Sequence, residues 1–532
     1  MATDAGIRSG SPPAPSTTRG TDPKWWTLAA VCLGTFMLLL DLTIVNVALP
    51  AIQRALHSSF ADLQWVVDAY ALTLAALLLT AGSLADMFGR RLLWVIGLVI
   101  FTAASVTCGA AQSPLMLELS RGAQGVGGAI MFSVSLALLA NAFHGRDRGV
   151  AFGMWGATTG VAVAIGPIAG GALVSGLSWR YIFFVNLPVG AVAVVLSVTR
   201  VIESRNPQAR RPDWLGFGLF TVALACLIYA LIESGSIGFG ATRVVACFAA
   251  AGVLLAAFLV TELRGEHPMF DLALFELPTF SGGAIAAFGM SAGIWSVLLY
   301  LVLYLQDVLR FSALQTGLRL LVLSGGVLAV SWLAGRLSSK VPVRLLIGPG
   351  LALIGVALLL MRGIDAHSDW THLIPGLVAA GIGAGFVNPP LASTAVGVVQ
   401  PQRAGMASGI NSTFRQVGIA TGIALLGTLF SNHLTQAVTA RTSGTPLSSS
   451  AGAISTGLES GNVGRLVRAV PSRQRGLLEL VLRGSFTSSL DEILLVAAIT
   501  TFVSAALALV LIRSKDFAHA GQRDANPSAA AH

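Results

Sequence analysis

The chain has 532 residues, of which 55% are hydrophobic and only 11% are charged, and its mean hydropathy is +0.78. An ordinary soluble domain carries roughly a quarter charged residues, so this composition excludes a soluble enzyme, a disordered chain and a disulfide scaffold. The net charge of +9 comes from basic residues scattered between apolar runs, which argues against a nucleic-acid partner. The composition therefore predicts an all-α integral membrane protein with many spans.

Apolar runs long enough to cross a bilayer follow one another along the chain. Because a span needs about 20 mostly apolar helical residues, the sequence predicts fourteen transmembrane helices. Their expected limits are 26–49, 63–84, 92–112, 115–141, 149–174, 181–200, 214–233, 243–262, 279–306, 314–335, 344–362, 372–397, 404–431 and 487–512.

Basic residues are more numerous in those loops that an internal N-terminus would place in the cytoplasm. Cytoplasmic loops of membrane proteins collect Lys and Arg, and an even number of spans returns the chain to the same side. Both termini are therefore expected in the cytoplasm. Arginine far outnumbers lysine, which suggests a GC-rich bacterial genome and hence the bacterial inner membrane.

A short pattern occurs twice with an offset of 253 residues. Ala81-Gly-Ser-Leu is followed by Arg91, and Ala334-Gly-Arg-Leu is followed by Arg344. Transporters are commonly built from such internal repeats, so two six-helix bundles with two inserted spans are expected. The expected divisions are an N-terminal tail at 1–24, a first bundle at 25–205, spans seven and eight with their linkers at 206–275, a second bundle at 276–515 that includes an external loop at 432–486, and a C-terminal tail at 516–532.

Three motifs combine glycine with charge or proline. GSLADMFGRR, which starts at Gly82, follows the second span, and Asp147 in the next internal loop is the expected partner of Arg90. RGAQGVGGA, which starts at Arg121, lies in the fourth span, where small residues let helices approach closely. GVAVAIGPIAGG lies in the fifth span, where Pro167 should kink the helix. The residues expected to serve gating and conformational change are Gly82, Asp86, Gly89, Arg90, Arg91, Asp147, Gly166, Pro167, Gly170 and Gly171.

These motifs resemble the signatures of the major facilitator superfamily, and the third resembles the signature of its exporters. LDLTIVNVALP at 40–50 and WRYIFFVNLPVG at 179–190 resemble the fourteen-span drug:proton antiporter family, as does NSTFRQVG from Asn411. The resemblance covers about residues 25–513. It implies the major facilitator fold, a secondary transporter rather than an enzyme, and export of drugs such as quaternary ammonium compounds in exchange for protons. Leu321-Val322 departs from the family, which often has Leu-Pro there.

Four ionisable residues are expected to couple transport to protons. Counting along the helices places Asp41, Asp68, Glu118 and Arg121 at similar depth in the outer half of the membrane, where they would form one charged cluster if their faces converge. Burial and a nearby arginine act in opposite directions on the pKa of a carboxyl group, so such a group can bind and release a proton. Asp41 is expected to be the main coupling carboxylate and Asp68 the second. The structural alternatives are a cap at the end of the first span for Asp41 and a wet rim for Asp68.

A substrate cavity is expected between the bundles. Aromatic faces there would attract lipophilic cations, and arginines would bind anionic groups or pair across the repeat. Interfacial anchoring and snorkelling are the alternatives for the same residues. The side chains expected to line the cavity are Asn46, Trp65, Tyr70, Gln124, Trp295, Tyr304, Arg319, Asn411 and Arg415.

The energy source is expected to be an ion gradient or the substrate's own gradient. None of the three lysines, Lys24, Lys340 and Lys515, follows a glycine as a nucleotide-binding loop requires. Proton exchange is what the resemblance implies, and sodium stays open. The expected function is proton-coupled export of drugs or other lipophilic, often cationic, compounds by alternating access. The alternatives are a dedicated exporter of one natural product, lipid, siderophore or amino acid, and a membrane-embedded enzyme or sensor, for which no catalytic constellation is seen.

The expected partners are small lipophilic substrates, protons and the lipid bilayer, without nucleic acid. The four cysteines lie in apolar stretches, and neither they nor the histidines have metal-ligand spacing, so no metal and no cofactor is expected. The oligomeric state stays open, with a monomer among the alternatives.

Overall fold

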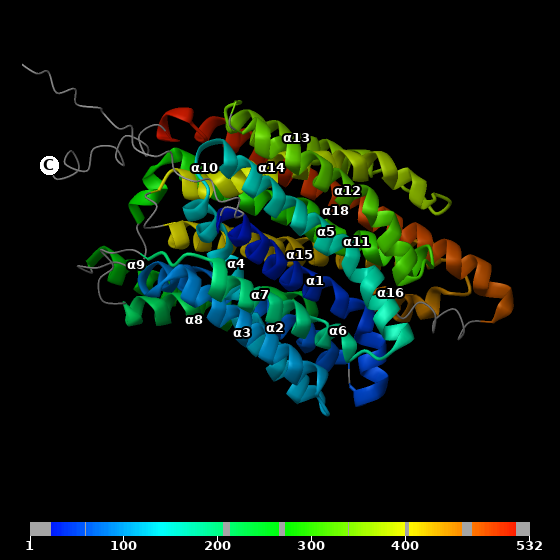
Figure 1. Ribbon diagram of the computed structural model, residues 1–532. Helices are drawn as coiled ribbons and strands as arrows, with labels where there is room; N and C mark the ends of the chain where they lie inside the picture. The colour runs from blue at the N-terminus through cyan, green and yellow to red at the C-terminus, as the bar shows by residue number, and fades with distance from the viewer. Residues whose placement is uncertain are drawn as a thin grey trace, which may run out of the picture.

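The computed structural model describes residues 23–58, 60–205, 213–264, 272–338, 340–399, 404–459 and 471–517 (Figure 1). Within these ranges the structure is helical throughout and contains no β-strand, which confirms the expected all-α class. The expected C-terminal tail is described only at residues 516 and 517, and of the expected N-terminal tail only residues 23 and 24 are described.

The first part of the chain forms nine helices. Ser113 caps the N-terminus of α4 by accepting a hydrogen bond from the backbone of Met116, and Pro114 occupies the first turn, where its missing N–H costs nothing. Asp213 caps α8 in the same manner through the backbone N–H of Gly216. The helices are α1 (Pro23–Leu56), α2 (Phe60–Phe88), α3 (Arg90–Gly109), α4 (Pro114–Ala142), α5 (Gly145–Gly176), α6 (Tyr181–Phe184), α7 (Asn186–Arg200), α8 (Trp214–Ile237) and α9 (Thr242–Arg264).

The second part begins with a helix that changes its winding twice. Two π-helical segments, Ser291–Trp295 and Tyr304–Val308, interrupt it, and such segments are frequent at functional sites. The α-helices of this part are α10 (Pro278–Met290), α11 (Ser296–Leu303), α12 (Ala313–Leu337), α13 (Arg344–Leu360), α14 (Ile374–Gly397), α15 (Ala404–Thr442), α16 (Ala451–Glu459) and α18 (Arg475–Leu511).

Helix is present at each of the fourteen expected spans. Within the described residues, 12 helices are long and apolar enough to cross a membrane, and the bent helix α5 makes a thirteenth. The remaining expected span corresponds to α13, which is apolar but has only 17 residues. The protein is thus a multi-pass membrane protein, and the number fourteen stays a prediction.

The packing of the first part recurs in the second. Helix α2 packs on α4 as α12 packs on α14, and α3 packs on α4 and α7 as α13 packs on α14 and α18. The two parts meet through α5 on α12 and through α2 on α15, which are equivalent pairs under the same correspondence. Helices α8 and α9 pack on each other and reach the rest of the molecule mainly through contacts of α8 with α2 and α15. Two related six-helix bundles with an inserted pair produce this arrangement, while the exact bundle boundaries stay predictions.

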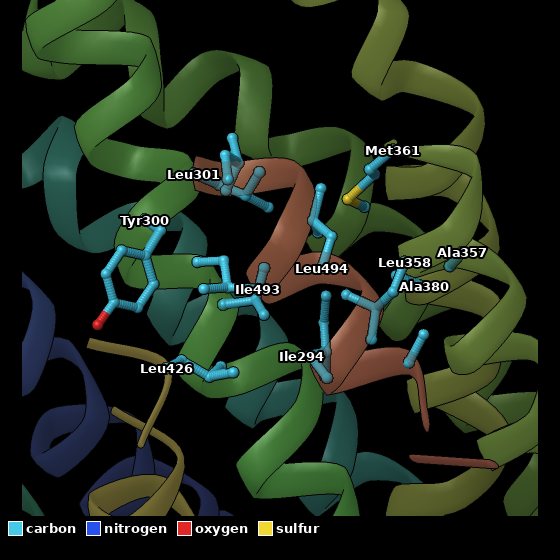
Figure 2. Packing of buried hydrophobic residues seen from close by; sticks show 14 of the residues in the cluster. Ile294, Tyr300, Leu301, Ala357, Leu358, Met361, Ala380, Leu426, Ile493 and Leu494 are labelled. Carbon is cyan, nitrogen blue, oxygen red and sulfur yellow. The ribbon is translucent and has the colours of Figure 1, made fainter. Parts of the chain in front are cut away.

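The apolar core of the second part joins its helices tightly. Figure 2 shows Ile294 and Leu301 facing Ile493 and Leu494 of α18, and all four side chains are buried. Tyr300 lies at the edge of this cluster, where its hydroxyl donates to the carbonyl oxygen of Ile423 at 3.2 Å. Because protein interiors are closely packed, such a bundle moves as a unit rather than deforming continuously.

The expected loop at 432–486 is largely helical where it is described. Helix α15 continues to Thr442, α16 follows, and α18 already begins at Arg475. Leu434, Val438, Leu478 and Val481 are all buried and belong to the core of the second part. The helices therefore extend beyond the expected spans and pack on one another there, at the right of Figure 1, because their apolar periodicity continues past the expected span ends.

Candidate functional site: buried charges and a sealed end

An ion pair lies inside the first bundle between α1 and α4. The Asp41 side chain is 0% exposed and that of Arg121 is 1% exposed, and Arg121 Nη1 donates to Asp41 Oδ2 at 2.5 Å. Removing two charges from water is costly, so such a pair is tolerated only when further hydrogen bonds complete it. An isolated charge at either position would be far less favourable than the pair.

Polar side chains from three helices complete the bonding of Asp41. Its Oδ1 accepts hydrogen bonds from Gln124 Nε2 at 2.9 Å and from Asn186 Nδ2 at 3.1 Å. The hydroxyl of Ser105 in α3 accepts from the same two amides at 2.7 and 3.2 Å. Asp41 thus binds α4 and α7 directly and α3 through these two amides, and α7 begins at Asn186. A change in the charge of this one carboxyl group therefore affects the contacts of four helices.

Helix α2 contacts the same pair through Arg121. The Arg121 guanidinium lies 4.3 Å from the ring centroid of Tyr70, and its Nε donates to the carbonyl oxygen of Val66 at 3.0 Å. The ring of Tyr70 is fully buried and packs edge-on against Phe101. Arg121 is therefore held by α1, α2 and α4 within the first bundle.

Within the described residues, neither of the other two expected coupling acids forms a hydrogen bond or ion pair with Asp41 or Arg121, so their place in one cluster stays a prediction. Asp68 faces Glu233 of α8 as its charged neighbour. Glu118 lies near the N-terminus of α4 with Asp62 as its charged neighbour. The direction in which each side chain points decides its partners, and spacing along the helices alone does not give that direction.

The two bundles are joined at the end that carries residues 82–91 and 335–344, named here the signature end. Asp86, which is 6% exposed, accepts hydrogen bonds from the backbone N–H groups of Gly405 and Met406 at 3.0 and 2.9 Å. Arg90 Nε donates to Asp86 Oδ1 at 2.8 Å. One carboxylate thus binds the start of α15 across the interface, where the α15 N-terminus favours negative charge.

Backbones touch at both bundle contacts of the signature end. A Cβ added at Gly82 would overlap the carbonyl oxygen of Gly405, and one added at Gly149 would overlap that of Gly335. These are the equivalent contacts of α2 with α15 and of α5 with α12. Ser408 Oγ also donates to the carbonyl oxygen of Ser133 at 2.5 Å. The structure is therefore closed at the signature end.

The expected pair of Arg90 with Asp147 is wrong. Asp147 accepts a hydrogen bond from Lys24 at 2.9 Å, while Arg90 pairs with Asp86 one turn earlier. Asp86 lies four residues before Arg90 in the sequence, so it was the nearer of the two candidate carboxylates for this arginine. Gly89 adopts φ +123°, a conformation that favours glycine, and this turn brings Arg90 to the start of α3.

Arg91 binds the chain that follows α7. Its backbone N–H donates to Glu203 Oε1 at 2.9 Å, and its guanidinium lies 3.8 Å from Glu203 Oε2. Glu203 was not among the expected residues, although an acidic residue shortly after the last helix of the first bundle is a natural partner for a basic turn at the same end.

Helix α5 bends by 42° between its segments Asp147–Val163 and Ile168–Gly176. The break contains Gly166 and Pro167, and proline removes a backbone donor from a helix, as expected. A Cβ at Gly166 would overlap Thr43 of α1, and one at Gly170 would lie 3.0 Å from Ile44, whereas Gly171 faces open space. The motif thus fits α5 against α1 within the first bundle.

Most of the expected cavity aromatics pack within the protein. Trp65 stacks on Tyr229 of α8 at 6.0 Å, and the Tyr304 hydroxyl donates to the carbonyl oxygen of Ser368 at 3.2 Å. Trp295 packs against the core of the second bundle. The side chain of Asn46, like that of Pro167, lies outside those that the structure describes. The indicated role of these aromatic residues in substrate binding stays a prediction.

The two expected arginines of the second bundle differ in position. Arg319 stacks on Phe311 and Trp370, with its Cζ 3.6 and 5.0 Å from their ring centroids. Arg415 is buried at 8% exposure in α15, and its Nη2 donates to Asn388 Oδ1 of α14. Within the described residues no carboxylate forms an ion pair with Arg415. Asn411, one turn before Arg415, is also buried.

A groove of about 640 Å³ lies between α1, α5 and α12, and none of the nine expected cavity residues lines it. Its walls are almost wholly apolar. The residues that line it are Phe36, Met154, Ala157, Thr158, Val161, Leu328, Ala329 and Trp332.

Several residues of the site escaped sequence reasoning. Asn186 lies within the WRYIFFVNLPVG motif, which could have marked it as a candidate site residue. Ser105 and Asn388 lie in apolar runs, where a lone small polar residue gives no indication of its partner. Only the folded arrangement of α3 and α14 reveals what they bind.

Repeated helix packing, a buried ion pair and a sealed end define a membrane transporter built from two related halves. The chain belongs to the Major Facilitator Superfamily, which matches residues 31–423. It is 38% identical over 409 residues to the multidrug resistance protein Stp of Mycobacterium tuberculosis, covering 77% of this chain and 76% of that protein. It is 32% identical over 490 residues to the tetracenomycin C resistance and export protein of Streptomyces glaucescens, covering 91% of each.

Two further comparisons agree with this assignment. The chain is 35% identical over 444 residues to a probable actinorhodin transporter of Streptomyces coelicolor, covering 80% of this chain and 77% of that protein. Among solved structures, the human organic anion transporter MFSD10 is similar with a TM-score of 0.59 and 15% identity, covering 90% of this chain and 99% of that one. At this identity the structural likeness concerns the fold alone.

Proposed function

We propose that this protein is a proton-coupled antiporter that exports drugs or other lipophilic compounds across the bacterial inner membrane. The observation that carries the proposal is the fully buried Asp41–Arg121 pair, which joins the helices of the first bundle. Relatives that are 38% and 32% identical to this chain over their aligned parts bear the names of a multidrug resistance protein and an antibiotic resistance and export protein. Multidrug names among them favour a broad exporter over one dedicated to a single natural product.

The bonding of Asp41 supports a role for protons. Protonation removes the negative charge, so the ion pair with Arg121 is lost and the amides of Gln124 and Asn186 lose their charged acceptor. The contacts between α1, α4 and α7 then weaken together. A carboxyl group that alternates between these two states biases a bundle between two packings, which is what alternating access requires.

We place the signature end on the cytoplasmic side, with both termini there. The excess of basic residues in the loops of that end supports this orientation. The Asp86 contact and the glycine contacts then close the cytoplasmic side, so the structure represents a cytoplasm-closed state. One chain supplies both bundles of the transport pathway, so we propose a monomer as the working unit.

The test uses purified full-length protein in liposomes that contain a pH-sensitive dye. After a pH gradient is imposed, a panel of cationic, neutral and anionic lipophilic compounds is added. We expect compound-dependent proton flux with the native chain and none with Asp41→Asn, although that variant still inserts and folds. Proton flux that Asp41→Asn leaves unchanged would contradict proton coupling through Asp41, and dependence on sodium instead would contradict proton coupling altogether. Flux with only one compound would favour the dedicated exporter.

A further inference from the structure

The second bundle contains a buried arginine whose only hydrogen-bond partner in the described structure is a neutral amide. We propose that Arg415, Asn388 and Asn411 form a subsite that binds an acidic group of the transported compound, such as a carboxylate or an ionised phenol. The subsite deepens the proposed function, because it names a substrate class for the same transport pathway.

The charge of Arg415 lacks the compensation that Arg121 has. Arg121 bonds to Asp41, whereas Arg415 donates to the carbonyl oxygen of Asn388, and no charged side chain is identified as its electrostatic neighbour among the described residues. Burying an unpaired cation is unfavourable. The planar guanidinium is suited to carboxylates and other oxyanions, which it binds through two parallel hydrogen bonds. An acidic ligand would supply the missing negative charge.

Two unused polar atoms belong to Asn388, which Arg415 contacts, and to Asn411, one helical turn before Arg415. Asn388 is 1% exposed and its Nδ2 has no hydrogen-bond partner, while Asn411 is 3% exposed and its Oδ1 has none. Asn388 Nδ2 can donate a second hydrogen bond to a bound oxyanion, and Asn411 Oδ1 can accept from a hydroxyl or amide group next to it. Buried polar atoms are nearly always paired in proteins, so two unpaired ones beside an uncompensated cation indicate a ligand.

The position of these residues fits a compound that contacts both bundles. Asn411 lies three residues after Ser408. Ser408 donates to the carbonyl oxygen of Ser133 of α4 in the sealed interface. Pro389 next to Asn388 lies 3.3 Å from the position that a Cβ at Gly156 of α5 would take. The subsite therefore lies beside the junction of the bundles, immediately beyond the seal.

The test compares two probes with one aromatic body and opposite charge, pyrenebutyrate and pyrenebutyl-trimethylammonium. Equilibrium dialysis of the purified full-length chain gives the Kd for each. Because a charged hydrogen bond in a dry site is strong, we expect Arg415→Gln to weaken pyrenebutyrate binding by about 10- to 100-fold, and ammonium-probe binding by less than about twofold. Arg243→Gln, which removes an exposed arginine at the start of α9, is the matched control and should change neither.

A second variant covers the case in which Arg415→Gln does not fold. Asn388→Asp keeps the size of the side chain and places a carboxylate against Arg415, so it should occupy the subsite itself and exclude pyrenebutyrate. Binding of the ammonium probe should persist in Asn388→Asp, because the subsite carries no net charge there.

The outcomes separate this subsite from the proposed function. If the native chain binds and transports the ammonium probe but does not bind pyrenebutyrate, drug export stands and the subsite is wrong. Equal weakening of both probes by Arg415→Gln, in a variant that elutes as folded protein, would assign Arg415 a structural role and overturn the subsite. Retention of pyrenebutyrate by Asn388→Asp would also overturn it.

Discussion

Besides Arg90 at the signature end, each bundle buries an arginine within one of its helices, Arg121 in α4 and Arg415 in α15, and these two are satisfied in opposite ways. Arg121 in the first bundle has a carboxylate, an amide, a backbone carbonyl and an aromatic face around it, all from the protein. Arg415 in the second bundle bonds, among the residues that the structure describes, only to the neutral Asn388. A complete internal network responds to protons, because protonation is the change that breaks it. An incomplete one responds to a ligand, because binding completes it. Related helix packing thus carries two different chemistries.

The largest expected effect comes from breaking the complete network. Arg121→Gln leaves Asp41 buried without a cation, which should lower the free energy of unfolding by about 3–5 kcal/mol. Because protonation relieves an unpaired buried carboxylate, the loss should be smaller at acidic than at alkaline pH. Thermal unfolding of the detergent-solubilised variant at several pH values measures it.

Two controls accompany this variant. The double variant Asp41→Asn with Arg121→Gln should recover most of the lost stability, since neither charge remains. Arg415→Gln should change the stability by only about 1 kcal/mol, because its partner Asn388 is neutral. Equal losses for Arg121→Gln and Arg415→Gln would show that the two arginines are equivalent, against the comparison drawn above.

An intermediate effect is expected at the seal, to which both bundles contribute equally. In Gly149→Val the added side chain would overlap the carbonyl oxygen of Gly335, and overpacking of this kind costs about 1–3 kcal/mol. The closed signature end should then become less populated, so a cysteine introduced there should react faster with a water-soluble maleimide and export should slow. Gly218→Val, on an exposed face of α8 with nothing within 4 Å, is the control. Unchanged labelling would mean that the contact does not hold the seal.

The smallest expected effect concerns the edge of the complete network. Ser105→Ala removes the hydroxyl that accepts from Gln124 and Asn186, while both amides keep Asp41 as acceptor. The free energy of unfolding should fall by about 1 kcal/mol, with proton-coupled export retained. The comparison is Thr199→Ala, whose hydroxyl bonds within its own exposed turn and should change stability by less than about 0.5 kcal/mol. Loss of export in Ser105→Ala would make Ser105 part of the coupling machinery itself.

The sequence predicts the fold well because span length and hydrophobicity are local properties. The apolar runs gave helices at each expected position, and the 253-residue repeat anticipated the recurrent packing. The motifs also marked Asp86 and Gly82, which contact the second bundle. Such signals need no knowledge of tertiary partners.

Partners across helices were harder to predict. Asp41 and Arg121 were expected to be close, and they form an ion pair, whereas Asp68 and Glu118 have Glu233 and Asp62 as charged neighbours. The rotation of each helix about its axis decides which of its faces contacts a neighbouring helix. A uniformly apolar sequence gives little indication of that rotation. Ser105, Asn186 and Asn388 became meaningful only once their helices were placed.

The central claim is that Asp41 in the first bundle exchanges the proton. It is tested most directly by counting protons released when pyrenebutyl-trimethylammonium binds to the purified chain in weakly buffered detergent solution. We predict release from the native chain and from Arg415→Gln, and none from Asp41→Asn, which should still bind the probe. Equal proton release from Asp41→Asn and the native chain would contradict the account.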